Sequence, residues 1–191
     1  MRSTVLSLAV LGLTFALPLA AQTRPDPSSL LAAQRQAMVP LARLDGVWRG
    51  PAWTITPNGR HEITQTERIG TFLGGSVRVM EGRGYNADGS VGFNALGIVS
   101  FDPATRAYTL TSWAQGRSGV FPFQVTADGY AWEIPAGPGA VIRYTATIGD
   151  GTLREVGMRV AGDAPPVQIF EMNLRRVGDT GWPAGDPVPM R

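Results

Sequence analysis

Glu67 and Arg78 are the residues of this sequence with the clearest capacity for chemistry. They lie in two neighbouring β-like segments, 60–69 and 76–86, in which charged side chains fall on both faces of the two-residue alternation. If one of these faces lined the interior of a barrel, Arg78 could pair with Glu67 or clamp the carboxylate of a ligand. The plainer alternative, which the pattern favours, is a set of cross-strand Glu–Arg pairs on the outer surface.

A carboxyl group inside an apolar lumen would also suit acid–base catalysis, with Glu67 assisted by Tyr144 or Arg78. The residue inventory weighs against an enzyme. The chain has no cysteine, all 17 of its basic residues are arginine, and His61 is its one histidine. These counts exclude thiolate chemistry, lysine Schiff bases and metal sites built from several histidines. His61 lies beside an expected turn, where we expect a solvated side chain. The inventory therefore favours ligand binding over catalysis and predicts no metal site.

Large apolar side chains of the middle segments form a second group of candidates. The group comprises Trp113, Phe121, Phe123, Trp132, Tyr144 and Met158. Apolar walls with a few polar groups are typical of a small-molecule pocket, although they also describe a packed barrel core. Because ten strands enclose more room than about eight, we expect a cavity. We predict that Glu67, Arg78 and the members of this group contact its ligand.

The elements that would position these residues begin at Gly46, where short runs of β-formers start to alternate with turn residues. We predict strands at residues 47–55, 60–69, 76–86, 92–102, 107–113, 120–126, 130–134, 141–148, 152–160 and 167–177. Asn58-Gly59, between the first two, is the strongest hairpin signal of the chain. The predicted fold is all-β: a ten-stranded antiparallel up-and-down β-barrel, closed so that no edge is exposed, with a short N-terminal helix.

The chain before the barrel divides into an export signal and a lead-in segment. Arg2, a short apolar run and small residues predict a signal peptide that ends at about Ala21. The apolar run is shorter than a membrane span, and no cysteine follows it for a lipid anchor. We therefore expect an exported, soluble periplasmic protein with no membrane span after cleavage. The lead-in segment, 22–44, contains a helix at 30–38 that Ser28 and Ser29 would cap. The barrel is expected at 45–178 and a flexible tail at 179–191.

The charge balance argues against a nucleic-acid partner. The net charge is only +2 although the isoelectric point is 9.5, because the very high pKa of arginine sets the isoelectric point. The chain contains no basic run and no patch of basic and aromatic residues. We predict no binding to nucleic acid.

Gly46-Val47-Trp48, at the start of the first predicted strand, resembles the Gly-x-Trp signature of the calycins, the superfamily of lipocalins and their relatives. The resemblance implies that Trp48 closes one end of the barrel and that an arginine of the last strand packs across its face. Alternation along that strand gives this role to Arg176, with Arg175 as the alternative if a bulge shifts the register. Gly46, Trp48 and Arg176 are thus expected to serve barrel closure.

The chain also resembles a bacterial family of lipocalin-like domains of unknown function. The resemblance lies in the sequence LDGVWRG at 44–50, in LGIVSFDP at 96–103, and in Tyr108-Thr109-Leu110 with Trp113. It covers about 38–177 and implies a ten-stranded calycin barrel without an assigned activity. The related nitrobindin-like barrels hold haem iron through a histidine late in the chain, whereas no histidine follows His61 here. We therefore predict no haem and no other cofactor.

These patterns lead to an exported lipocalin-like barrel that binds a small apolar or amphipathic ligand in its interior. The step from barrel to binding rests on the analogy of fold. Two alternatives remain: a small barrel enzyme that uses a lumenal carboxylate, and an envelope interaction module whose barrel is filled and binds no ligand.

Overall fold

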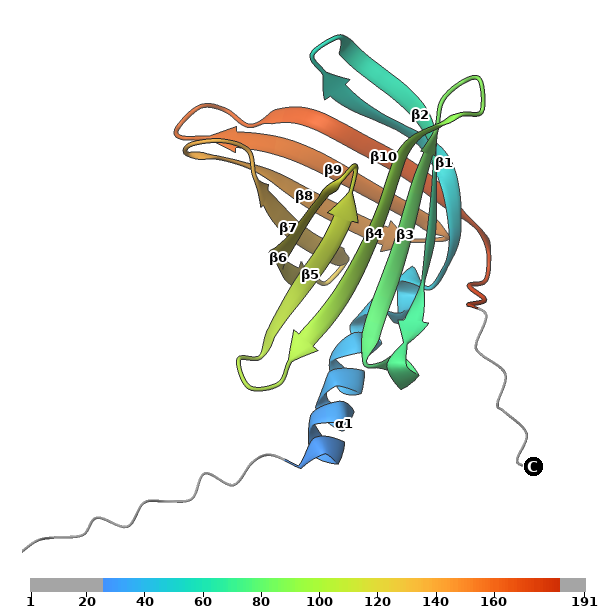
Figure 1. The fold of residues 1–191 in the computed structure, drawn as a ribbon, viewed down its shortest axis with the longest axis vertical. Coiled ribbons are helices and arrows are strands. Elements are labelled where there is room, and N and C mark those ends of the chain that lie inside the picture. The colour runs from blue at the N-terminus through green and yellow to red at the C-terminus, as the bar shows by residue number, and fades with distance from the viewer. Residues whose placement is uncertain (1–25, 183–191) are drawn as a thin grey trace, which may run out of the picture.

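The protein forms a closed ten-stranded antiparallel β-barrel with a helix at its lower end, as the computed structural model describes for residues 26–182 (Figure 1). The strands are β1 (Gly46–Thr56), β2 (Gly59–Phe72), β3 (Val77–Tyr85), β4 (Val91–Asp102), β5 (Ala107–Ala114), β6 (Arg117–Val125), β7 (Gly129–Pro135), β8 (Ala140–Gly149), β9 (Thr152–Ala161) and β10 (Val167–Gly178). Each strand pairs with the next one along the chain, and β10 pairs with β1. The predicted fold class is confirmed. The predicted signal peptide and residues 183–191 lie outside the described residues.

The helix α1 (Pro27–Met38) leads into the barrel and begins at Pro27 rather than at the predicted residue 30. Asp26, not the predicted serines, is its N-cap, and the Asp26 carboxylate accepts a hydrogen bond from the backbone N–H of Ser29 at 3.3 Å. Proline suits the first helical position because its missing N–H would have no partner there. A 3₁₀ turn, η1 (Val39–Leu44), continues the chain to β1. No helix within residues 26–182 is long and apolar enough to cross a membrane.

The end of α1 and the 3₁₀ turn η1 together plug the lower end of the barrel. Met38, Leu41 and Leu44 are at most 2% exposed, and they belong to one core cluster with Trp48 of β1. The indole Nε1 of Trp48 donates a hydrogen bond to the Leu44 carbonyl at 2.8 Å. Complete burial of each such side chain contributes about 1.5–3 kcal/mol. The plug is therefore part of the core, and it closes this end of the barrel.

An ion pair between the buried Arg78 and the partly exposed Asp45 holds the plug against the barrel wall. Arg78 of β3 is 2% exposed and donates from Nε and Nη2 to the two carboxylate oxygens of Asp45, at 2.8 and 2.9 Å. Its Nη1 donates to the Met38 carbonyl at 2.8 Å. This bidentate arrangement matches the planar guanidinium to the carboxylate. Three donors of the buried cation are thereby satisfied by the plug.

Arg176 does not stack on Trp48 within the described structure, so this prediction is wrong. The two residues are register partners on β10 and β1, yet the guanidinium turns elsewhere. It donates to the Asp45 carbonyl at 3.2 Å and to the Asp179 carboxylate at 2.6 Å. On this path it crosses Gly46, where a Cβ would lie 2.6 Å from Arg176 Nε. Because the plug already encloses Trp48, the indole has no exposed face for an arginine to cover.

Asp45→Ala tests the ion pair that holds the plug. The substitution leaves the Arg78 guanidinium buried with the Met38 carbonyl as its partner. Because Asp45 itself is 35% exposed, we expect a cost of about 3 kcal/mol, the lower end of the range for a buried pair. We expect urea denaturation to show a fall of this size in the free energy of unfolding. Glu133→Ala is the control, because the Arg143–Glu133 pair is exposed and contributes about 0–1 kcal/mol. Equal losses in the two variants would contradict the role given to Asp45.

Candidate functional site

Glu67 lies in the barrel interior, above the plug, because the strand register turns it inward. Its Cα partners are Trp48 on β1 and Gly82 on β3, and Trp48 faces the core. The two-residue alternation of β2 turns Ile63 and Gln65 to the same side. We call the interior space above the plug the lumen.

The Glu67 carboxylate has one occupied oxygen and one free oxygen. Gln65 Nε2 donates to Oε1 at 2.6 Å, whereas no described residue donates to Oε2. Gly82 provides the room for this group, since a Cβ there would lie 2.7 Å from Oε1 and 3.0 Å from Oε2. The side chain is only partly buried, although protein surrounds it, so solvent reaches it through the lumen. Glu67 thus offers an open hydrogen-bonding position in the middle of the barrel.

Burial raises the pKa of Glu67 from its ordinary value of 4.5 to about 8. The hydrogen bond from Gln65 opposes this rise, while the negative charges of Glu155 and Glu81 add to it. At neutral pH the group is therefore mainly a neutral carboxylic acid. A cation brought beside it would favour the carboxylate instead.

Glu155 of β9 is a second interior carboxyl group, and sequence analysis did not select it. It is 6% exposed, and both of its oxygens are occupied: Trp132 Nε1 donates to Oε1 at 2.8 Å and the Tyr130 hydroxyl to Oε2 at 3.0 Å. Burial raises the pKa of Glu155, and these two hydrogen bonds oppose the rise. The signal was present in the sequence, because Glu155 shares the inward face of its strand with Leu153.

Four aromatic rings form one side of the lumen, and we call them the aromatic wall. They are Phe121 of β6, Trp132 of β7, Tyr144 of β8 and Phe170 of β10. Adjacent ring centroids lie 5.9, 4.4 and 5.7 Å apart, and the rings of Trp132 and Tyr144 are stacked at an interplanar angle of 13°. All four side chains keep partial exposure, so the wall borders accessible space.

Inward-facing glycines shape both sides of the lumen. At Gly157, opposite Tyr144 and Phe170 in the strand register, a Cβ would lie 2.9 Å from each of these side chains. At Gly84, on the carboxylate side, it would lie 2.4 Å from Ile63 Cδ1. Contacts under 3.0 Å would force the neighbouring groups to move, so the missing side chains leave room for the wall and for Gln65 and Glu67, which we call the polar floor.

The predicted pair of Glu67 and Arg78 does not form. All three hydrogen-bonding groups of the Arg78 guanidinium are engaged by Asp45 and the Met38 carbonyl, below the lumen. Asp45 precedes the first strand and reaches Arg78 only because the plug folds against β3. The expected carboxylate clamp is therefore wrong, and the middle of the lumen holds carboxyl groups without it.

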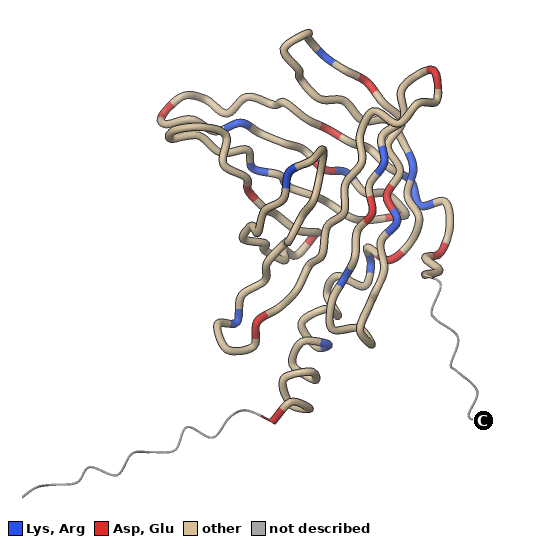
Figure 2. The backbone as a smooth tube through the Cα atoms, in the orientation of Figure 1, with Lys and Arg blue, Asp and Glu red and all other residues tan. Residues whose placement is uncertain are grey.

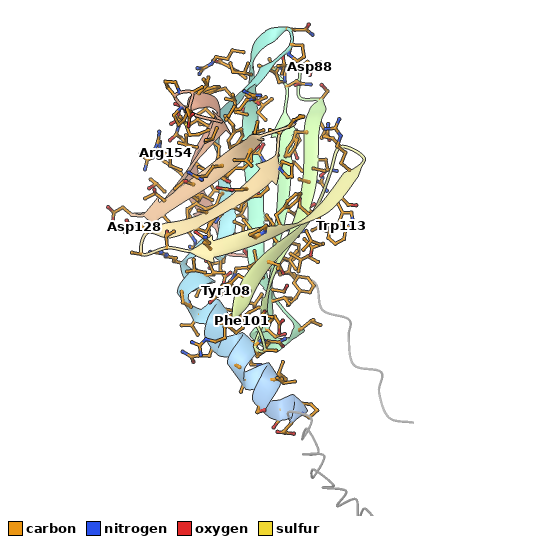
Figure 3. All side chains as sticks on the ribbon, turned by 90° about the vertical axis from the view of Figure 1, so that its left-hand side faces the viewer. Asp88, Phe101, Tyr108, Trp113, Asp128 and Arg154 are labelled. Carbon is orange, nitrogen blue, oxygen red and sulfur yellow. The ribbon has the colours of Figure 1, made fainter. Side chains whose placement is uncertain are left out.

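The other predicted contact residues divide between the lumen and the outer surface. Phe123 is inward but 3% exposed, and it stacks on Tyr130 at 5.1 Å in the core beneath the wall. Trp113 lies on the outer face and is 44% exposed (Figure 3), because its neighbour Ser112 has the inward parity of Leu110. Met158 also faces outward, since it pairs with the exposed Arg143. Neither Trp113 nor Met158 borders the lumen.

No protein-family model matches the chain, and no curated protein matches it. Among solved structures, the crystal structure of Rv2717c from M. tuberculosis is similar to it. The TM-score is 0.54 and the sequence identity 18%, over 77% of this chain and 99% of that chain. A likeness at this level of identity concerns the fold alone.

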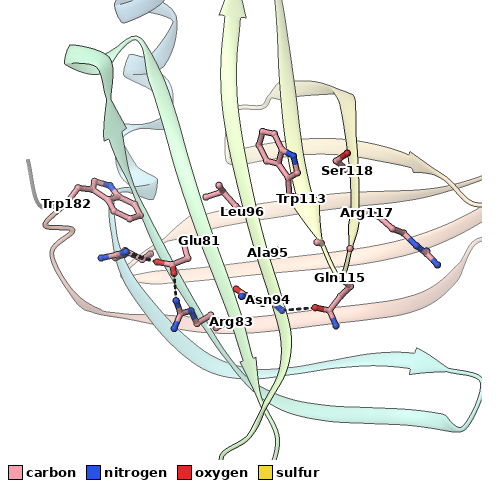
Figure 4. A pocket seen from close by; sticks show the side chains of 13 residues that line it. Glu81, Arg83, Asn94, Ala95, Leu96, Trp113, Gln115, Arg117, Ser118 and Trp182 are labelled. Atoms are coloured by element: carbon pink, nitrogen blue, oxygen red, sulfur yellow. Dashed lines mark hydrogen bonds and ion pairs between the residues drawn. The ribbon is translucent and has the colours of Figure 1, made fainter.

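A second hollow lies on the outside of the barrel, between Trp113 and Trp182 (Figure 4). It measures about 750 Å³ and is open to solvent. Glu81 is held there by Arg68 at 2.7 Å and by Arg83 at 2.8 Å. One carboxylate faces two guanidinium groups here, so the hollow keeps an excess of positive charge. Charged positions of both signs are interspersed along the barrel (Figure 2). Both oxygens of Glu81 are occupied, so this hollow has no carboxyl group with a free oxygen, although the buried Trp182 Nε1 in its lining donates to no described residue.

Glu67→Gln should change how stability depends on pH. Neutral Glu67 favours the folded state, so its contribution is fully present below the ordinary pKa of 4.5 and is lost as pH rises through about 8. The variant has no charge to bury. Relative to wild type it should gain stability, on the order of a few kcal/mol, between about pH 6 and about pH 9.

Urea denaturation at these two pH values measures the effect. Glu62→Gln, on the exposed face of the same strand, is the control and should follow the wild-type profile. If the Glu67→Gln profile also runs parallel to wild type, the interior carboxyl group is not neutral in the folded protein.

Proposed function

We propose that this protein binds a small amphipathic ligand in the lumen. The observation that carries the proposal is the aromatic wall, four inward-facing rings that stay partly exposed above a polar floor. Apolar walls with a few convergent polar groups are the usual make-up of a small-molecule site. The apolar part of the ligand would lie along the wall, and its polar group would reach Glu67.

The aromatic residues beneath the wall are tightly packed, whereas those of the wall keep partial exposure. This difference supports a binding site at the wall rather than a loosely packed core. Phe123 and Tyr130 belong to the same barrel, and they are 3% and 1% exposed. The wall begins two residues away on the same strands, at Phe121 on β6 and Trp132 on β7, which are only partly buried. Aromatic side chains bury about 150–250 Å² each when covered, so an apolar ligand along this wall would remove substantial surface from water.

A second candidate function is catalysis by a lumenal carboxyl group. Its support is Glu67, whose free oxygen and pKa near 8 suit proton transfer at neutral pH. Burial raises the pKa of Tyr144 to about 12, so this phenol would act as a donor and not as a base. Ligand binding needs only the wall and the open carboxyl group, and we place it first. Mass spectrometry of a bound ligand before and after incubation distinguishes binding from turnover.

We propose further that the mature protein is exported to the periplasm as a calycin-type barrel. The support is the order of Arg2, a short apolar run and the small residues before Gln22. The resemblance of Gly46-Val47-Trp48 to the calycin signature supports the family assignment.

Displacement of an uncharged fluorescent probe tests ligand binding. N-phenyl-1-naphthylamine should bind wild type saturably, and Tyr144→Ala should weaken binding about tenfold, equivalent to about 1.4 kcal/mol. Tyr144 suits this test because its removal leaves the Trp132 and Tyr130 bonds to Glu155 in place. Trp113→Ala removes an aromatic ring from the outer face and should bind as wild type does. Absence of saturable binding, or equal loss in both variants, would overturn the proposal.

Expression from the full sequence in a Gram-negative host tests export. We expect the protein in the periplasmic fraction, with a mass that corresponds to a mature N-terminus near Gln22. Leu11→Arg interrupts the apolar run and should leave the full-length protein in the cytoplasm. Wild type retained there at full-length mass would exclude export.

A further inference from the structure

We propose that the ligand is an organic cation, with its positive group beside Glu67 and its apolar part along the aromatic wall. The inference rests on the proposed function, since it names the ligand class of the same lumen. It follows from the charges that the barrel places in the interior and from the one oxygen that it leaves free.

The middle of the lumen is acidic. Glu67 and Glu155 both face it, and the one cation buried nearby, Arg78, is fully engaged by Asp45 and the Met38 carbonyl. Arg117 and Arg159 share the inward parity, but they are exposed and lie near the ends of β6 and β9. A carboxylate ligand that reached this part of the lumen would therefore find no positive partner, and the two carboxyl groups would repel it once they are ionised.

The two interior carboxyl groups differ in what they can still accept. Both oxygens of Glu155 receive donors from Trp132 and Tyr130, so Glu155 has no position left for a ligand. Glu67 accepts only from Gln65, and its Oε2 is reached from the lumen. A positive group beside Oε2 would supply the missing counter-charge, and where it carries an N–H it would also complete the hydrogen bonding of Glu67.

The wall complements a cation as well. The faces of aromatic rings carry negative electrostatic potential and attract ammonium groups, indoles most strongly. Trp132 and Tyr144 stack with ring centroids 4.4 Å apart, so each ring covers one face of the other, and a ligand would meet the parts of the stack that stay exposed. A neutral hydrocarbon would pack on this surface but would gain no cation–π attraction and would leave Glu67 without a partner. An organic cation uses both.

Cation binding should be coupled to proton release from Glu67. The groups around its carboxyl are Gln65 and Trp48, with Glu155 and Tyr130 across the lumen and Glu81 on the outer face of β3. None of them supplies a positive charge, so Glu67 must lose its proton to form an ion pair with the ligand. The apparent affinity for a cation should rise with pH and level off above about pH 8, since the pKa of Glu67 lies there.

Three probes of similar size, two of them with the same shape, separate charge from hydrophobicity. Benzyltrimethylammonium carries a fixed positive charge, neopentylbenzene is its uncharged counterpart, and phenylacetate is an anion of similar size. By calorimetry at about pH 8.5, we expect the cation to bind at least about tenfold more tightly than the uncharged probe, and phenylacetate most weakly. Lowering the pH to about 6.5 should weaken the affinity for the cation by about tenfold or more and leave the affinity for the uncharged probe unchanged.

Glu67→Gln should reduce the preference for the cation to the small part that the aromatic wall provides and should abolish its pH dependence, while binding of the uncharged probe persists. Glu62→Gln, on the outer face of the same strand, is the control and should retain both. Urea denaturation confirms that the variants are folded. If uncharged probes bind and the cation has no advantage, or keeps its advantage in Glu67→Gln, this inference fails and the proposed function stands. If no probe binds wild type, both fail.

Discussion

The pair of Arg78 and Asp45 connects the plug to the wall of the barrel, and the rest of the interior depends on it. A ten-stranded barrel without a plug would be open at both ends, and its middle would be flushed by solvent. With α1 and η1 seated by this bond, the barrel has a closed lower core and a single accessible upper layer. The same ion pair keeps the Arg78 guanidinium out of the lumen. The middle of the lumen therefore contains carboxyl groups and no buried cation.

The number of hydrogen-bond donors nearby explains why Glu67 has an oxygen free for a ligand and Glu155 does not. Glu155 lies between Tyr130 and Trp132, whose polar hydrogens would be unsatisfied without it, so it serves the structure. Glu67 lies opposite a glycine on β3 and next to a single amide, so half of its capacity is unused. In the interior, the carboxylate of Glu155 therefore has all its hydrogen bonds within the protein, whereas that of Glu67 has one oxygen free toward the accessible space.

The fold could be predicted because its signals are local: alternation with period two, and turns such as Asn58-Gly59 that join sequential strands. The same alternation left the face of Glu67 open, because charged side chains fall on both faces of this segment. Trp113 and Met158 were misplaced because their size was weighed without the parity of their neighbours. The partner of Arg78 was beyond local reasoning, since Asp45 meets it through a contact 33 residues apart in sequence. The stacking of Arg176 failed for a related reason, because the plug had already covered Trp48.

The glycines of the lumen wall have a consequence for how this barrel could diversify. Gly82, Gly84 and Gly157 define the interior by the atoms they lack, and each stands opposite a larger group on a neighbouring strand. Replacing one of them would narrow the space while strand number and shear stay the same. Single substitutions at these glycines could therefore produce relatives that accept ligands of different sizes, while the number and order of the strands stay the same.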